Sequence, residues 1–227
     1  MQPMPTTTDE ARVLAKIYDE AQQLFSGYDD PAHGWEHIGR VYTLALTIAQ
    51  HEQADAFVVG VAALLHDIGR LSHDDTQHHA DLSVGSAAEL LSRYEIAPSK
   101  QEAILHAIAA HSFSRGIEPA TLEAGIVRDA DRLDSLGAIG ILRWAITGTL
   151  KRMPQMRSYD PRDPFAEQHA PDDRRYMLDH FYSKLLKLAD NMFTPTGRRL
   201  AERRTAFMHA YLDEFRRELD IESELNR

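Results

Sequence analysis

Cysteine is missing from this chain, and its absence excludes several kinds of site at once. None of the 227 residues is cysteine, so disulfide bonds, iron–sulfur clusters and thiolate zinc sites are excluded. No apolar run approaches the roughly 20 residues that span a bilayer, and residues 1–10 lack the basic and apolar segments of a signal peptide. A chain without cysteine also suits a reducing compartment. We therefore expect a cytoplasmic protein without membrane contact.

Basic charge is scarce as well. The formal net charge is −10 at pH 7, which disfavours general affinity for a nucleic-acid backbone. No basic groove or series of stacking aromatics points to a nucleic-acid polymer. A small phosphorylated substrate stays open, because a metal ion or a local basic cluster can invert the local field.

The alternating pattern of β-strands is also missing, whereas helical periodicity runs through most of the chain. We expect helices over residues 9–26, 35–52, 54–68, 80–94, 119–131, 133–152, 172–191 and 196–222, with another opening at Pro98-Ser99. Gly69 is the expected C-terminal stop of the third helix. These elements predict one all-α domain over residues 1–227. Its core covers about 33–150, and C-terminal helices over 172–222 pack on that core.

Residues 153–171 interrupt the helical pattern. Four prolines in this stretch exclude a continuous helix. A connector of this length is uncommon and is often a lid, a binding loop or a disordered segment. The sequence leaves these three alternatives open.

Two metal-capable side chains, His66 and Asp67, end the helix that is apolar on nearly every side. The negative end of the helix dipole at this position favours a cation. The dipeptide alone proves little, because 12 histidines make chance pairs with aspartate expected. A second pair, His73-Asp74, lies in a polar stretch, and we interpret it as a decoy.

Two more candidate ligands come from other helices. His37 shares a helical face with Val41, Leu44 and Ile48, and Asp131 lies on a face of small residues. Each has an ordinary alternative as a hydrogen-bonded core histidine, a helix cap or an ion-pair partner. Taken together, however, these residues favour a metal. Unpaired buried carboxylates are costly, and a shared cation would explain why several occur on inward helix faces. The predicted ligands of a divalent metal are His37, His66, Asp67 and Asp131, with coordination positions left open for water or substrate.

The order of these four residues resembles the HD-domain metal-dependent phosphohydrolase superfamily, in particular its compact, stand-alone bacterial hydrolases. The local strings that carry the resemblance are HGWEH at 33–37, LLHDIG at 64–69, AHSFS at 110–114, DADRLD at 129–134, GAIG at 137–140 and TGRRLAE at 196–202. One departure is Gly34, where many relatives have an acid. The resemblance implies a helical bundle that hydrolyses a phosphoester or phosphoanhydride bond with metal-activated water. The implied substrate is a small phosphorylated molecule, above all a nucleotide or deoxynucleotide.

The same resemblance extends to further residues. His79 and His111 roughly match the extra histidines of relatives with two metals, although they could instead bind phosphate or simply pack. The implied metal is Mn, Mg, Co, Fe or Ni. Substrate phosphates are expected to meet Arg40, Arg70 and Lys184. Besides Asp67, the catalytic candidates are Asp74 and Asp75, which follow the His-Asp pair.

Two other functions remain open at this point. If His79 and His111 complete a di-iron centre, the protein could be an HD-type oxygenase. It could also be a regulatory module that binds a nucleotide without turning it over. A homodimer is one of the oligomeric states left open.

Overall fold

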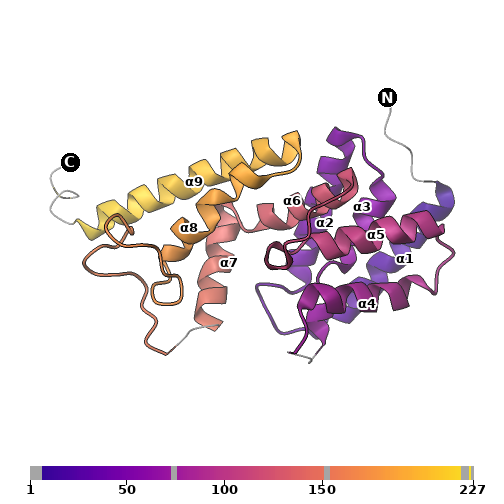
Figure 1. Cartoon of the computed structure of the whole chain (residues 1–227), viewed down its shortest axis with the longest axis horizontal. Helices are drawn as coiled ribbons and strands as arrows, with labels where there is room; N and C mark the ends of the chain where they lie inside the picture. The colour runs from indigo at the N-terminus through magenta and orange to yellow at the C-terminus, as the bar shows by residue number, and fades with distance from the viewer. Residues whose placement is uncertain (1–6, 73–75, 151–153, 221–224, 226–227) are drawn as a thin grey trace. The chain divides into compact units, whose positions relative to one another are not determined.

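The computed structural model describes residues 7–72, 76–150, 154–220 and 225, and these form α-helices and short 3₁₀ helices (Figure 1). An isolated bridge between Arg157 and Tyr176 is the only β-type pairing in the described residues. The all-α prediction is confirmed. None of the described helices is both long and apolar enough to cross a membrane.

The chain forms two compact units. Unit 1 comprises Met1–Asp134 and Met192–Gly197, and unit 2 comprises Ser135–Asn191 and Arg198–Arg227. The prediction of a single domain with C-terminal helices packed on the core stays a prediction.

Unit 1 is built around one buried helix, α3 (Ala56–Leu65). Its helices and 3₁₀ helices are α1 (Thr8–Phe25), α2 (Trp35–Glu52), α3, η1 (Ile68–Leu71), α4 (His79–Leu91), α5 (Pro98–Ala110), η2 (Phe113–Arg115) and α6 (Leu122–Asp134). Residues 57–65 are all buried, because α3 is apolar on every side and packs against α1, α2, α5 and α6. At its start the Asp55 carboxylate accepts hydrogen bonds from two backbone N–H groups. Side chains that leave the C-terminal end of α3 therefore start inside the core.

The end of α3 differs from the prediction of a helix reaching residue 68. Helix α3 ends at Leu65, His66 caps it, and Asp67 has non-helical backbone angles before η1 begins. Gly69 lies within η1 and so is not the predicted stop. A Cβ at Gly69 would lie 2.3 Å from the carbonyl oxygen of His79 and 2.4 Å from the backbone nitrogen of Ser83. Glycine is needed there because η1 packs directly on the backbone of α4.

The boundary between α6 and α7 (Gly137–Leu150) also lies later than predicted. Helix α6 covers residues 122–134, not 119–131, and the Thr121 hydroxyl accepts a hydrogen bond from Ala124 N near its start. Gly137, with φ of 72°, opens α7 in the left-handed region that favours glycine. Asp131 is consequently an interior residue of α6, which removes the alternative that it caps a helix.

The short segment 192–197 belongs to unit 1 because Asp129 of α6 holds it. The buried Asp129 carboxylate accepts hydrogen bonds from the backbone N–H groups of Phe193 and Thr194 and from the Thr194 hydroxyl. Gly125 leaves room for the Phe193 ring, whose nearest atom would lie 2.0 Å from an added Cβ. Asp129 thus has a structural role in holding this segment.

In unit 2 the predicted helix over 172–191 is wrong. The structure has α8 (Asp179–Ser183), η3 (Leu185–Lys187) and η4 (Ala189–Asn191) in its place, followed by α9 (Pro195–Leu219). The reason is a pairing with the preceding connector: Arg157 N donates to Arg175 O at 2.9 Å, and Met177 N donates to Arg157 O at 2.9 Å. These bonds hold residues 175–177 out of a helix.

The connector predicted over 153–171 has an ordered conformation from Pro154 onward. The Asp163 carboxylate accepts hydrogen bonds from the backbone N–H groups of Glu167, Gln168 and His169. The His169 ring lies 2.7 Å from Asp163 and 2.9 Å from the buried Asp179. Burial would raise the pKa of Asp163, but these donors outweigh it and lower the pKa to about 2. The connector is therefore held by its own polar side chains.

Candidate metal centre

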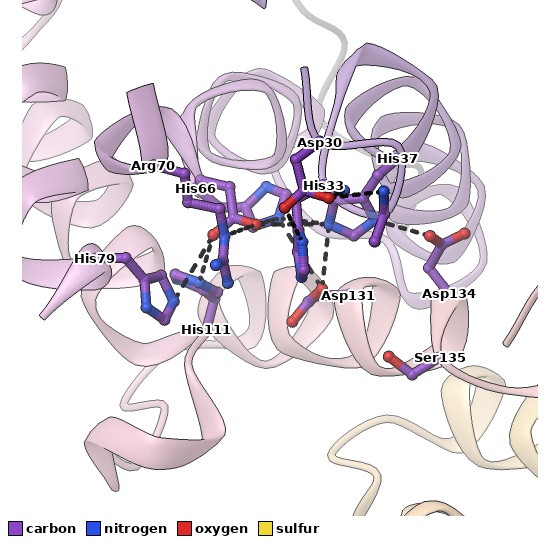
Figure 2. Close-up of polar contacts among 12 residues, drawn as sticks. Asp30, His33, His37, His66, Arg70, His79, His111, Asp131, Asp134 and Ser135 are labelled. Carbon is purple, nitrogen blue, oxygen red and sulfur yellow. Dashed lines mark hydrogen bonds and ion pairs between the residues drawn. The ribbon is translucent and has the colours of Figure 1, made fainter. Parts of the chain in front are cut away.

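The four predicted ligands lie close together inside unit 1, and Figure 2 labels three of them, His37, His66 and Asp131. His37 comes from α2, His66 and Asp67 from the junction of α3 with η1, and Asp131 from α6. His37 Nε2 lies 3.3 Å from His66 Nε2, 3.5 Å from Asp131 Oδ1 and 3.7 Å from Asp67 Oδ2. His66 Nε2 lies 3.7 Å from Asp67 Oδ2 and 4.0 Å from Asp131 Oδ1. Neighbouring donors around an ion bound at about 2.1 Å are roughly 3.0–3.4 Å apart, so modest contraction would bring these four around one divalent ion.

Both histidines present the Nε2 atom to this point because Nδ1 is occupied. His37 Nδ1 lies 2.7 Å from Asp134 Oδ2, and His66 Nδ1 lies 2.8 Å from the carbonyl oxygen of Ala63. If Nδ1 carries the proton and donates it to these oxygens, Nε2 keeps the lone pair that a metal needs. Asp131 and Asp134 are one helical turn apart on α6. Asp131 therefore faces the ligand group, while Asp134 supports His37.

The group is deeply buried on one side and accessible on the other. The side chains of His37 and His66 are 0% exposed and that of Asp67 is 3% exposed, whereas that of Asp131 is 27% exposed. Burial lowers the pKa of His66 to about 4, so its imidazole is neutral near pH 7. The access at Asp131 is the side from which water or a substrate can enter.

Asp67 stays ionised despite its burial. Burial would raise its pKa, but the positive charge of Arg70, whose Nε lies 2.6 Å from Asp67 Oδ2, holds the pKa well below its usual range together with the nearby histidines. A buried carboxylate in this state calls for compensating positive charge. The arrangement supplies part of it through Arg70.

A second group of donors faces the other oxygen of Asp67. His111 Nε2 lies 3.6 Å and His79 Nε2 3.7 Å from Asp67 Oδ1. These distances exceed hydrogen-bond length, and the buried Oδ1 accepts no hydrogen bond from the part of the chain that the structure describes. His111 Nδ1 lies 2.6 Å from the carbonyl oxygen of Ile108, which again leaves Nε2 as the free nitrogen. Burial, and then the charge of Arg70, lowers the pKa of His79 to about 3.

The donor set therefore fits metal binding. An orphaned buried carboxylate oxygen, imidazoles that point Nε2 inward and two adjacent groups that share Asp67 are what a divalent ion would satisfy. His37, His66 and Asp67 form one group and Asp67, His79 and His111 the other. Figure 2 shows His79 and His111 on one side of the cluster and Asp134 on the other.

The arginines predicted to contact substrate have partners within the cluster. Arg40 donates from Nε and Nη2 to the two carboxylate oxygens of Asp134, at 2.7 and 2.9 Å. Arg70 pairs with Asp67. Their side chains are nonetheless 34% and 22% exposed, and their contacts with substrate stay predictions.

Sequence reasoning missed the role of Asp134. Its carboxylate joins His37 to Arg40 and is 1% exposed. The available signal was its position one turn after Asp131, on the face already assigned to the site. Nothing in the spacing alone identified which imidazole it would support.

The remaining predicted residues fall elsewhere. Asp74 and Asp75, like the decoy pair His73-Asp74, lie outside the described residues. Lys184 caps α8 in unit 2, and its role in binding substrate stays a prediction. At Gly34 an added Cβ would lie 3.0 Å from the carbonyl oxygen of Asp30. The acid near this loop is instead Asp30, whose Oδ2 lies 2.8 Å from His33 Nδ1.

Comparison with known proteins agrees with this fold. The HD domain family matches residues 34–136, which include all four predicted ligands. YpgQ of Bacillus subtilis is 34% identical over 197 residues, covering 84% of this chain and 86% of that protein. The chain belongs to the HD domain family, and its resemblance to compact members is confirmed.

Solved structures extend the likeness to nearly the whole chain. The crystal structure of Bacillus subtilis YpgQ in complex with ADP has a TM-score of 0.71 at 32% identity, covering 93% of this chain and 97% of that one. An HD-superfamily hydrolase from Bacillus thuringiensis has a TM-score of 0.72 at 30% identity, covering 93% and 98%. Ribonuclease Y of Thermoanaerobacter pseudethanolicus is 35% identical over 122 residues, which cover 53% of this chain but 22% of that protein. The likeness to ribonuclease Y is thus confined to a part of each protein.

Proposed function

We propose that this protein is a metal-dependent phosphohydrolase that cleaves a phosphoester or phosphoanhydride bond of a small phosphorylated molecule. The observation that carries the proposal is the buried group of His37, His66 and Asp67. The partly exposed Asp131 lies within 4.0 Å of both imidazoles. When bound there, a divalent ion would lower the pKa of water and polarise a phosphoryl oxygen.

The chain's own residues have distinct tasks in this proposal. Asp134 orients His37, and the carbonyl oxygen of Ala63 orients His66, so that both imidazoles would present Nε2 to the ion. Asp67 would help to hold the ion. Arg70 lies beside Asp67 and is partly exposed, so its guanidinium can turn to a substrate phosphate once metal charge compensates Asp67.

The Asp67–His79–His111 group supports a second ion in the same centre. Asp67 would help to hold both ions, since it belongs to both groups: Oδ2 faces one and Oδ1 the other. Without a second ion, His79 at 25% side-chain exposure would be placed to donate to a phosphate oxygen. Metal content per chain distinguishes these two versions.

A nucleotide or deoxynucleotide is the substrate that we propose. The relative YpgQ, similar over most of both chains, has a crystal structure in complex with ADP. The net charge of −10 favours a small ligand over a nucleic-acid polymer. The base, the sugar and the bond that is cleaved are left to the experiment.

A screen of phosphate release tests the proposal. Metal-stripped protein is loaded with Mn²⁺, Mg²⁺, Co²⁺, Fe²⁺ or Ni²⁺ and given nucleotides, deoxynucleotides, cyclic nucleotides and simple phosphoesters, with products identified by mass. We expect metal-dependent hydrolysis of at least one nucleotide. Nucleotide binding without turnover under every metal would contradict it and support a regulatory module instead.

The shared carboxylate also favours a second candidate, a di-iron oxygenase. Two groups of nitrogen and oxygen donors joined by Asp67 suit a pair of iron ions. Two irons per chain together with O₂ consumption, and no phosphate release, would establish this alternative.

A further inference from the structure

Residues of the segment between α7 and α8, whose course Figure 1 shows, line a cavity of about 690 Å³ in unit 2. Its volume falls within the roughly 300–1,000 Å³ of small-molecule sites. Among the residues that line it are three arginines, Arg157, Arg162 and Arg175. These three exposed arginines bring three positive charges to a cavity of ligand size.

None of these three guanidinium groups forms an ion pair with a carboxylate among the described residues. Elsewhere in the structure arginines find such partners, as Arg216 does in Glu167 at 2.7 Å. One carboxylate, that of Asp160, also lines the cavity. It accepts a hydrogen bond from the backbone N–H of Arg162 at 3.0 Å. Three cations against one anion leave the cavity wall with net positive charge, which favours an anionic ligand.

The backbone fixes the arrangement of the arginines. Arg157 and Arg175 sit on the paired segments, because Arg157 N donates to Arg175 O at 2.9 Å. The Arg175 guanidinium also lies over the ring of the buried Tyr176, 5.2 Å from its centroid. Arg162 follows the turn that Asp160 closes. Because this backbone is already ordered, binding a ligand here would cost less conformational entropy than binding one to a free loop.

We propose that this cavity binds a small oligophosphate, a molecule with at least two linked phosphate groups. Guanidinium groups form bidentate hydrogen bonds with phosphate oxygens, and several of them surround a multiply charged phosphate chain better than a single anion. All of the residues that carry this proposal belong to unit 2, and none is a predicted metal ligand. The proposal therefore stands independently of the chemistry at the metal centre.

Titration calorimetry of the full-length protein with pyrophosphate, in buffer containing EDTA, tests the site. We expect binding that weakens about tenfold or more in Arg157→Gln, since a hydrogen bond to a charged group contributes about 1.5–3 kcal/mol. We expect the double variant Arg157→Gln with Arg175→Gln to lose detectable binding. The matched control is Arg174→Gln, an exposed neighbour outside the cavity wall, which should change the affinity less than twofold.

Three results would overturn the proposal. They are no binding of pyrophosphate to the unaltered protein, unchanged binding by the double variant, and an equal loss in Arg174→Gln, which would indicate general charge attraction. Asp67→Ala supplies the second arm: retained binding supports the unit 2 cavity, whereas lost binding would assign pyrophosphate to the metal centre. Circular dichroism of each variant checks that the helices remain. Failure of the hydrolysis screen would leave this outcome unaffected.

Discussion

Both units contain a cluster of charged or metal-capable residues, but the two clusters are held in place differently. Side-chain hydrogen bonds position the cluster in unit 1, whereas backbone hydrogen bonds position the one in unit 2. In unit 1 the ligands start from helices or helix ends, and hydrogen bonds at Nδ1 fix the imidazoles of His37 and His66. In unit 2 backbone hydrogen bonds fix Arg157 and Arg175, while their side chains are exposed. Charges in a buried cluster need dedicated partners because burial removes their hydration, whereas the cations in an exposed cavity wall stay hydrated. We therefore expect substitutions to have far larger effects in unit 1 than in unit 2.

The largest effect is expected for Asp67→Ala, because it removes a ligand from both donor groups. Metal content should fall to background, and turnover should drop by at least about 10³-fold, roughly 4 kcal/mol of transition-state stabilisation. Elemental analysis and phosphate release measure the two quantities. Asp81→Ala, a surface aspartate that pairs with Arg115, is the control and should keep both. Retained turnover in Asp67→Ala would remove the basis of the site assignment.

A smaller effect is expected for Asp134→Asn, which keeps the shape of the side chain and removes its charge. Metal affinity should fall about 10–100-fold, as is usual for the loss of a group that orients a ligating histidine. Titration with Mn²⁺ measures it. Arg40→Gln is the comparison variant, because it leaves the contact of Asp134 with His37 in place. A greater loss in Arg40→Gln than in Asp134→Asn would mean that the ion pair, and not support of His37, is what matters.

The smallest effect is expected in unit 2 for His169→Asn. Hydrogen bonds to Asp179 and Asp163 raise the pKa of His169, so its contribution to stability is fully present below about pH 6.5 and is lost as the pH rises through the raised value. The variant should unfold about 1–2 °C lower than the unaltered protein at pH 6. This deficit should shrink toward pH 9. Thermal melts over this pH range, with the exposed His51→Asn as control, measure it; a deficit that grows with pH would contradict the assignment.

The same contrast explains how far the sequence predicts the structure. The range of α2, residues 35–52, and the inward position of His37 follow from apolar periodicity, because a buried helix face is a local pattern. The burial of His66 and Asp67 follows from the all-apolar stretch that precedes them. The absence of a helix over 172–191 does not follow from such local patterns. It depends on Arg157 pairing with residues 175–177, a contact between distant positions that local pattern cannot reveal. Asp134 lies between these cases, on the predicted face but with a partner on another helix.

The packing of Gly69 against α4 acts as a spacer within the metal centre. Gly69 N donates to the Ser83 hydroxyl at 2.9 Å, and its Cα approaches the backbone of His79 closely enough to exclude any Cβ. Asp67 precedes Gly69 by two residues, and His79 is itself part of this contact. Backbone packing of η1 against α4 thus sets how close Asp67 lies to His79. Even a single methyl group at position 69 would push η1 away from α4, and with it Asp67 away from His79.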